Sequence, residues 1–144
     1  MKHLILALFS LGISTTYAQD NCTDFHTGYF EYTVSGERYI LYRTETHQIE
    51  YGLNNSDWII MSMEWKSDCA YSMVFLNCAD SDAGATFIGK TLDARIVNSD
   101  ESGYAFVAEV KEMSFVTKGE ISLPTTELTS GQKKKIQRVL KKNS

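Results

Sequence analysis

The chain has 144 residues, of which 43% are hydrophobic and 22% charged, so it is long enough for one domain with a hydrophobic core. Residues 19–130 carry 7 basic and 18 acidic side chains, whereas residues 131–144 carry 6 basic side chains and no acidic one. Nucleic-acid binding depends on neutralising phosphates, so an acidic body of this kind predicts no nucleic-acid partner.

The first 18 residues have the pattern of a secretory signal peptide. Lys2 and His3 form a short basic start, residues 4–13 are an almost unbroken apolar run, and Ala18 is the small residue before the expected cut. The apolar run is too short to cross a bilayer, which takes about 20 residues. We therefore expect cleavage after Ala18 and an exported mature chain, periplasmic or secreted, that begins at Gln19.

Period-two alternation of apolar and polar residues runs from Gly28 to Ile121 and predicts a series of short strands. Clusters of turn-forming residues, such as the one at 54–57, separate the strands. We expect the alternating apolar side chains to point into one shared interior. The predicted strands are residues 28–34, 38–44, 48–53, 58–65, 69–78, 87–97, 104–110 and 114–121.

Regular spacing of short strands predicts an all-β fold, an antiparallel meander of about eight strands. It would close either as an up-and-down barrel, as in lipocalin-like proteins, or as a two-sheet sandwich. Gly28-Tyr29-Phe30 resembles the Gly-x-Trp of lipocalins, with the Trp missing. The β domain is expected over residues 19–124. Residues 125–144 then form a linker and a short basic helix over 132–142, with Ser130 as the expected N-cap.

Three cysteines in an exported chain predict one disulfide and one remaining thiol. If residues 69–78 form one strand, Cys69 and Cys78 lie roughly 30 Å apart, while a disulfide needs Cα atoms within about 7 Å. The pairs Cys22–Cys69 and Cys22–Cys78 remain. Cys22–Cys69 is the favoured pair, because each of the two residues lies just before the strand that follows it.

Residues that could support catalysis or bind a metal are scattered. His26 and His47 have no metal-binding spacing, and residues 80–84 resemble the start of a calcium loop but lack its later ligands. The sequence has neither a nucleophile elbow nor a phosphate-binding glycine loop. We therefore expect no enzyme, no metal site and no cofactor.

Methionine and aromatic side chains on adjacent predicted strands are the most suggestive feature. Methionine adapts to irregular shapes, and aromatic walls suit small apolar ligands or lipids. The alternative is an ordinary packed core, in which case the protein would be an envelope-associated interaction module that acts through its surface. The candidate ligand-binding residues are Met61, Met63, Trp65, Tyr71, Met73 and Phe75.

The basic tail, residues 131–144, has three interpretations. As an amphipathic helix it would make weak contact with anionic lipid headgroups at a membrane surface. Alternatively, it folds back on the acidic body, or it is a solvated terminal helix.

Three motifs resemble those of a family of short exported bacterial proteins with no established activity. The resemblance extends from about Cys22 to Val110, and the basic tail departs from the family pattern. It implies a Cys22–Cys69 disulfide and no catalytic residue. Some members carry a topoisomerase IV label, but an acidic, exported body of this size does not fit a DNA-binding machine. The motifs are Cys22-x-x-Phe25-x-x-Gly28-x-Phe30, Trp65-x-Ser67-Asp68-Cys69-x-Tyr71 and Ile88-Gly89-Lys90.

Overall fold

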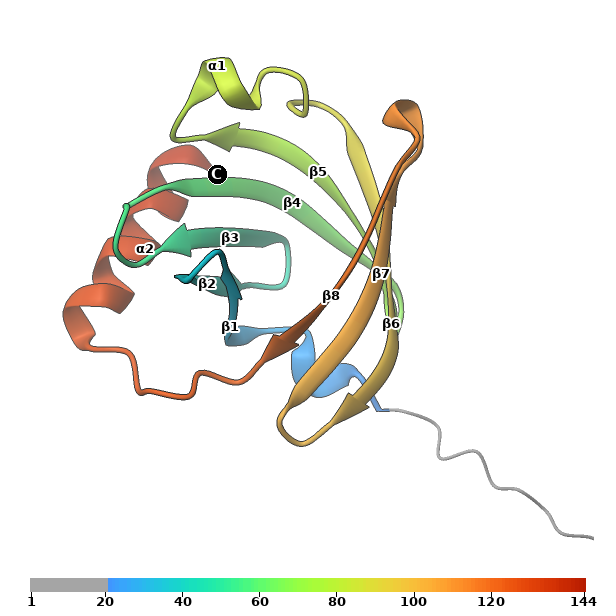
Figure 1. The fold of residues 1–144 in the computed structure, drawn as a ribbon, viewed down its shortest axis with the longest axis horizontal. Helices are drawn as coiled ribbons and strands as arrows, with labels where there is room; N and C mark the ends of the chain where they lie inside the picture. Colours follow the sequence, from blue (N-terminus) through green and yellow to red (C-terminus); the bar gives the residue numbers. More distant parts are fainter. Residues whose placement is uncertain (1–20) are drawn as a thin grey trace, which may run out of the picture.

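Eight antiparallel strands close into a barrel in the computed structural model, which describes residues 21–144 (Figure 1). Each strand pairs with the next one in the chain, and β8 returns to β1. The all-β prediction is confirmed, with the barrel as the closure. The predicted signal peptide, residues 1–18, lies outside the described residues. The strands are β1 (Gly28–Val34), β2 (Glu37–Arg43), β3 (His47–Gly52), β4 (Trp58–Ser67), β5 (Ala70–Cys78), β6 (Thr91–Asp100), β7 (Gly103–Val110) and β8 (Phe115–Ser122).

Short helices complete the described part of the chain. The 3-10 helix η1 (Thr23–Phe25) precedes β1 at one end of the barrel, and the single turn α1 (Ser81–Gly84) follows β5 at the other end (Figure 1). The 3-10 helix η2 (Lys111–Met113) joins β7 to β8, and α2 (Ser130–Asn143) ends the chain. The segment 80–84, which resembles the start of a calcium loop in sequence, therefore contains one helical turn.

The sixth strand lies further along the chain than the alternation predicts. Residues 87–90 form a turn in which Gly89 has a φ of 80°, a left-handed conformation that suits glycine. The strand continues past the predicted end, and its last residue, Asp100, pairs with Gly103. The gap between the predicted strands 87–97 and 104–110 therefore shrinks to a turn of two residues.

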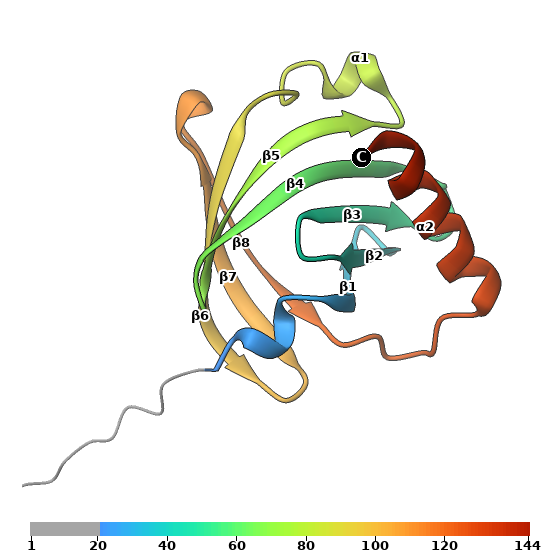
Figure 2. The same ribbon diagram turned by 180° about the vertical axis from the view of Figure 1, so that it is seen from behind.

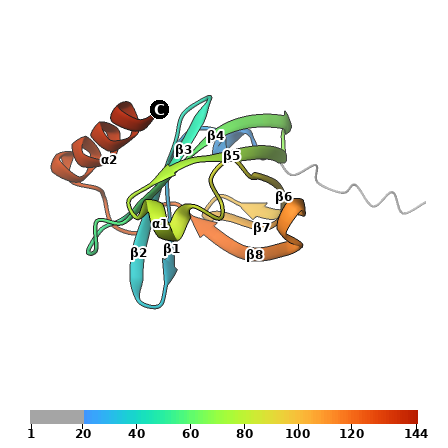
Figure 3. The same cartoon turned by 90° about the horizontal axis from the view of Figure 1, so that it is seen from above.

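Two apolar layers stabilise the fold, one inside the barrel and one outside it. The outer layer lies between α2 and the outer face of β2, β3 and β4 (Figure 2). Figure 3, seen from above, places α2 outside the ring of strands. The helix brings Ile136 and Leu140 onto the strands, and both are buried. The outer layer comprises Ile40, Ile49, Tyr51, Ile60, Leu128, Ile136 and Leu140.

This outer layer makes the prediction of one shared interior wrong for β3. Ile49 and Tyr51 face outward under α2, so the alternate residues Gln48 and Glu50 point into the barrel. The physical reason is that α2 shields the outer face of β3 from water, so the apolar residues of this strand are buried on that side. Its alternate, polar residues then face the barrel interior.

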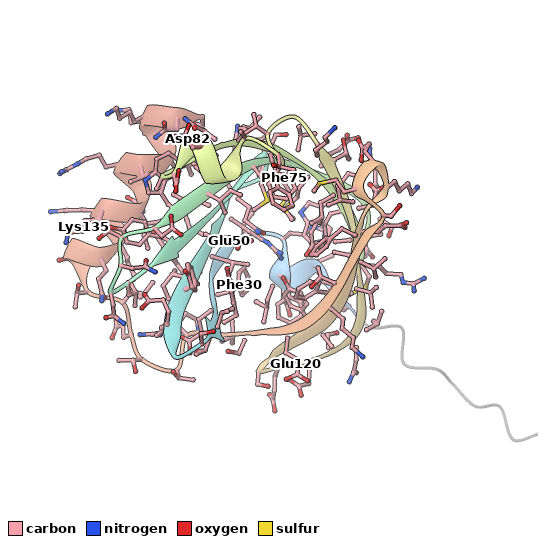
Figure 4. The ribbon with its side chains drawn as sticks, turned by 45° about the horizontal axis from the view of Figure 1, so that its top comes forward. Phe30, Glu50, Phe75, Asp82, Glu120 and Lys135 are labelled. Atoms are coloured by element: carbon pink, nitrogen blue, oxygen red, sulfur yellow. A yellow bond between two sulfur atoms is a disulfide. The ribbon has the colours of Figure 1, made fainter. Side chains whose placement is uncertain are left out.

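The terminal helix begins differently from the prediction and leaves its basic side in solvent. Thr129, not Ser130, is the N-cap, and it forms a capping box with Gln132. The tail folds back through its apolar side, while basic residues such as Lys135 point away from the barrel (Figure 4). None of the ion pairs found within residues 21–144 involves α2. Contact of this exposed basic side with a membrane surface stays a prediction.

The junction of β1 and β8, the seam of the barrel, has the least strand pairing. The two strands share one registered pair, Glu31 with Ser122, whereas β1 pairs with β2 along its whole length. The Glu31 carboxylate accepts hydrogen bonds from the backbone N–H and hydroxyl of Thr125, at 3.0 and 2.7 Å, and from Arg38 Nε at 2.6 Å. Glu31 therefore connects the seam to the linker that leads to α2.

Glu31 should make stability depend on pH. Burial alone would raise its pKa, but the hydrogen bonds from Thr125 and the Arg38 ion pair outweigh burial, so the pKa of Glu31 is lowered from 4.5. The stabilisation is then present above that value and is lost as the pH falls through the lowered pKa. We expect Glu31→Gln to cost about 2 kcal/mol at pH 7, from lost charged hydrogen bonds, and less at pH 3. Urea unfolding of both proteins at the two pH values measures this, and an equal cost at both would contradict it.

Candidate ligand cavity

The barrel interior contains a cavity of about 450 Å³. It reaches from the open end of the barrel, where α1 lies, toward Arg43, and it borders the β1–β8 seam. All eight strands contribute to its wall, and most of the apolar wall residues come from β4, β5, β6 and β7. The apolar wall residues include Ile59, Met61, Met73, Phe75, Leu92 and Phe106.

The structure brings four of the six predicted ligand-binding residues to the cavity wall. Met61, Tyr71, Met73 and Phe75 line the cavity, and Figure 4 shows Phe75 inside the ring of strands. Met63 and Trp65 also belong to the interior apolar cluster, but they do not line the cavity.

The closed end of the barrel is sealed by η1 and a disulfide. Cys22 and Cys69 are bonded, with Cα atoms 5.1 Å apart, which confirms the favoured pair. The bond holds η1 against the start of β5, and Phe25 of η1 is buried with its ring 4.9 Å from that of Tyr104. Cys78 is the free thiol, and its Sγ lies 2.9 Å from the Asp80 carbonyl oxygen.

Arg43 lies buried above this seal, with 1% of its surface exposed. Its guanidinium donates to the Gln48 side-chain oxygen at 2.5 Å, to the Phe25 carbonyl at 3.0 Å and to the Tyr71 hydroxyl at 3.1 Å. These bonds explain why a charge is tolerated inside the barrel.

Aromatic rings surround the same guanidinium. Its central carbon lies within 6 Å of four ring centroids, a distance at which a ring attracts a cation when water is absent. The rings and distances are Tyr71 at 4.9 Å, Tyr104 at 5.4 Å, Phe30 at 5.5 Å and Trp65 at 5.8 Å.

Glu50 is the acidic residue that lines the cavity from β3. Its carboxylate accepts hydrogen bonds from the Tyr32 hydroxyl at 2.6 Å and from the Gln48 side-chain nitrogen at 2.8 Å. Burial raises the pKa of Glu50, against the opposite effects of Tyr32, Gln48 and the Arg43 charge. Arg43, Gln48, Glu50 and Tyr32 thus form one continuous polar network across β1, β2 and β3.

Sequence reasoning missed this polar network, although a signal for it was present. In the segment 38–44, apolar residues occupy both faces, with Tyr39 and Leu41 on one and Ile40 and Tyr42 on the other. Such a strand is covered on both sides. If the terminal helix provides the outer cover, the apolar residues of the next strand can face that helix and release its polar residues to the interior.

The two histidines considered as candidate functional residues, His26 and His47, lie outside the cavity lining. The His26 ring stacks on Trp65 at 3.6 Å, and its Nε2 lies 2.8 Å from the Asp68 carbonyl oxygen. His47 Nδ1 lies 2.9 Å from the Thr46 hydroxyl. Within residues 21–144 no group of three or more His, Cys, Asp or Glu side chains is arranged to hold a metal ion.

Comparisons of the chain with protein-family models, with curated proteins and with solved structures found no match. The resemblance to the family of short exported bacterial proteins therefore stays a prediction. Among the helices of residues 21–144, none has the length and apolar character needed to cross a membrane. The disulfide is compatible with an exported protein.

Proposed function

We propose that this chain is an exported, non-enzymatic barrel that binds a small, mainly apolar ligand or lipid in its interior. The observation that carries the proposal is the cavity of about 450 Å³, which is lined by Met61, Tyr71, Met73 and Phe75. Ligand sites are typically concave, mostly apolar and roughly 300–1,000 Å³ in volume, with a few placed polar groups. The network from Arg43 to Tyr32 would supply those groups.

The cavity also favours ligand binding over the alternative function, an interaction module with a solid core. An interaction module with a solid interior would fill its barrel with side chains, as small barrels often do. The space between Met61, Met73 and Phe106 is instead large enough for a ligand. Export is supported by the signal-peptide pattern of residues 1–18 and by the disulfide, which persists in oxidising compartments.

A cavity-filling substitution tests this function. Ala94 lines the cavity and is buried, so Ala94→Leu should occupy part of the space with little strain. Ala70 lies outside the cavity lining on β5, so Ala70→Leu adds the same atoms elsewhere. We expect the neutral fluorescent probe N-phenyl-1-naphthylamine to bind the unmodified protein and the Ala70→Leu variant alike. It should bind Ala94→Leu about tenfold more weakly, because one or two apolar contacts are lost.

Fluorescence titration of the three proteins gives the affinities, and circular dichroism shows whether each is folded. Binding that is unaffected by Ala94→Leu would place the probe outside the barrel. No binding to any of the three would contradict the proposed function.

A further inference from the structure

Four charged residues line the cavity, and two of them have side chains that point into the barrel. Lys118 and Glu120 border the cavity through β8, but both are exposed and alternate with the inward positions Gly119 and Ile121. The interior charges that remain within the described residues are those of Arg43 and Glu50.

These two groups differ in what they can offer a ligand. Arg43 is 1% exposed and donates hydrogen bonds to three protein oxygens, so its charge is enclosed by protein groups. Glu50 is only partly buried, and it lies closer to the open end of the barrel than Arg43 does, next to Tyr32. Figure 4 shows Glu50 inside the ring of strands. A ligand that enters from the open end therefore meets the carboxylate before the guanidinium.

Glu50 also faces a second hollow at the open end, of about 370 Å³. Three aromatic residues line it, and two of them, Tyr32 and Tyr39, stack with ring centroids 5.2 Å apart. Trp58 is the third. Asp57 and Asp80 are its other acidic residues, and no lysine or arginine is part of its lining. Aromatic faces and carboxylates together attract organic cations.

We propose that the ligand of this barrel is a small cationic amphiphile, an organic amine or quaternary ammonium compound, whose apolar part fills the cavity and whose cationic group lies at Glu50. This inference rests on the proposed function, because it names the chemistry of a ligand in the same cavity. Burial raises the pKa of Glu50, whose charged and titratable neighbours are Tyr32 and Arg43. A cation placed beside this partly buried carboxylate would therefore stabilise its charged form.

An anionic amphiphile fits this arrangement less well. Its headgroup would have to pass Glu50 to reach Arg43, whose guanidinium is already bonded to Gln48, Phe25 and Tyr71. Like charges brought together in a water-poor site repel strongly. A neutral alcohol meets neither attraction nor repulsion, so it reports the contribution of the apolar tail alone.

Four compounds with the same tail test the inference: octylammonium, octyltrimethylammonium, octanoate and 1-octanol. We expect both cations to bind about tenfold or more tightly than octanol, and octanoate to bind more weakly than octanol. Isothermal titration calorimetry at pH 6 gives the affinities. A bound cation favours the charged form of Glu50. In the pH range where Glu50 is partly protonated, cation binding should therefore release protons, and the heat measured there should change with the ionisation enthalpy of the buffer.

Glu50→Gln is the matched variant, since the amide keeps the shape and can still accept from Tyr32. We expect it to lose both the preference for cations over octanol and the proton release. Glu109→Gln removes a charge from an exposed position of β7 outside the cavity, and it should retain both.

The possible results separate this inference from the proposed function. Octanoate binding more tightly than the cations would assign headgroup recognition to Arg43 and overturn the inference. Equal binding of cations and octanol would also overturn it, while leaving the binding function intact. If none of the four compounds binds, both the inference and the proposed function fail.

Discussion

Replacing Arg43 with methionine should destabilise the barrel by about 4 kcal/mol, as is typical when one partner of a buried charged network is removed. Methionine has a similar length but no donors, so the Gln48 oxygen, the Phe25 carbonyl and the Tyr71 hydroxyl lose the donors that bond them now. Glu50 also loses the nearby positive charge that lowers its pKa. We therefore expect the free energy of unfolding to fall at pH 7 and to recover partly at low pH, where Glu50 is neutral.

Two further variants serve as controls, one for the charge of Arg43 and one for the loss of an arginine at an exposed position. Arg43→Lys keeps the charge, but its donors all lie on one nitrogen and cannot replace the three guanidinium nitrogens that bond Gln48, Phe25 and Tyr71, so it should recover only part of the loss. Arg95→Met changes an exposed position on β6 and should lie within about 0.5 kcal/mol of the unmodified protein. Urea denaturation followed by tryptophan fluorescence measures all three. A cost for Arg43→Met no larger than that for Arg95→Met would show that the buried network does not stabilise the fold.

Loss of the Cys22–Cys69 bond should have an effect of similar size. The bond closes a loop of 47 residues, for which the loss of chain entropy in the unfolded state is worth about 4 kcal/mol. It also holds η1 at the closed end, so its removal should loosen Phe25 and weaken the seal below Arg43. Cys22→Ser with Cys69→Ser should lower the thermal midpoint by tens of degrees or prevent folding at 37 °C, since about 1 kcal/mol shifts the midpoint of such a domain by several degrees.

Cys78→Ser is the matched control, because Cys78 lies outside the disulfide and serine can still donate to the Asp80 carbonyl. It should change the midpoint by only a few degrees. Scanning calorimetry with and without a reductant completes the test, since the reductant should destabilise the unmodified protein and leave the double variant unchanged. Insensitivity of the unmodified protein to reduction would contradict the role given to this bond.

Local alternation was sufficient to predict most of the barrel wall. The segments around β1, β5 and β7 start and end within a residue of their predicted bounds, because each has polar turn residues on both sides. The sixth strand was predicted to begin too early because the apolar residues Phe87 and Ile88 were included in it, while Gly89 turns the chain there with a positive φ. The sequence predicts a disturbance near Gly89, but a glycine in a strand-like segment indicates a bulge as readily as a turn.

The candidate site was predictable only in its apolar half. Met61, Tyr71, Met73 and Phe75 follow from period-two alternation on strands that have one covered face. Gln48 and Glu50 could not be assigned in the same way, because the direction of β3 depends on α2, more than 75 residues later in the sequence. The polarity of a strand's inner face is a tertiary property whenever another element covers its outer face.

Native mass spectrometry of the protein purified from the cells that normally produce it tests the central claim most directly. We predict a folded species whose mass exceeds that of the chain by one small molecule. This excess should disappear on denaturation, and a smaller fraction of Ala94→Leu should carry it. Only the mass of the bare chain, under conditions gentle enough to keep the fold, would contradict the account of the barrel as a ligand-binding protein.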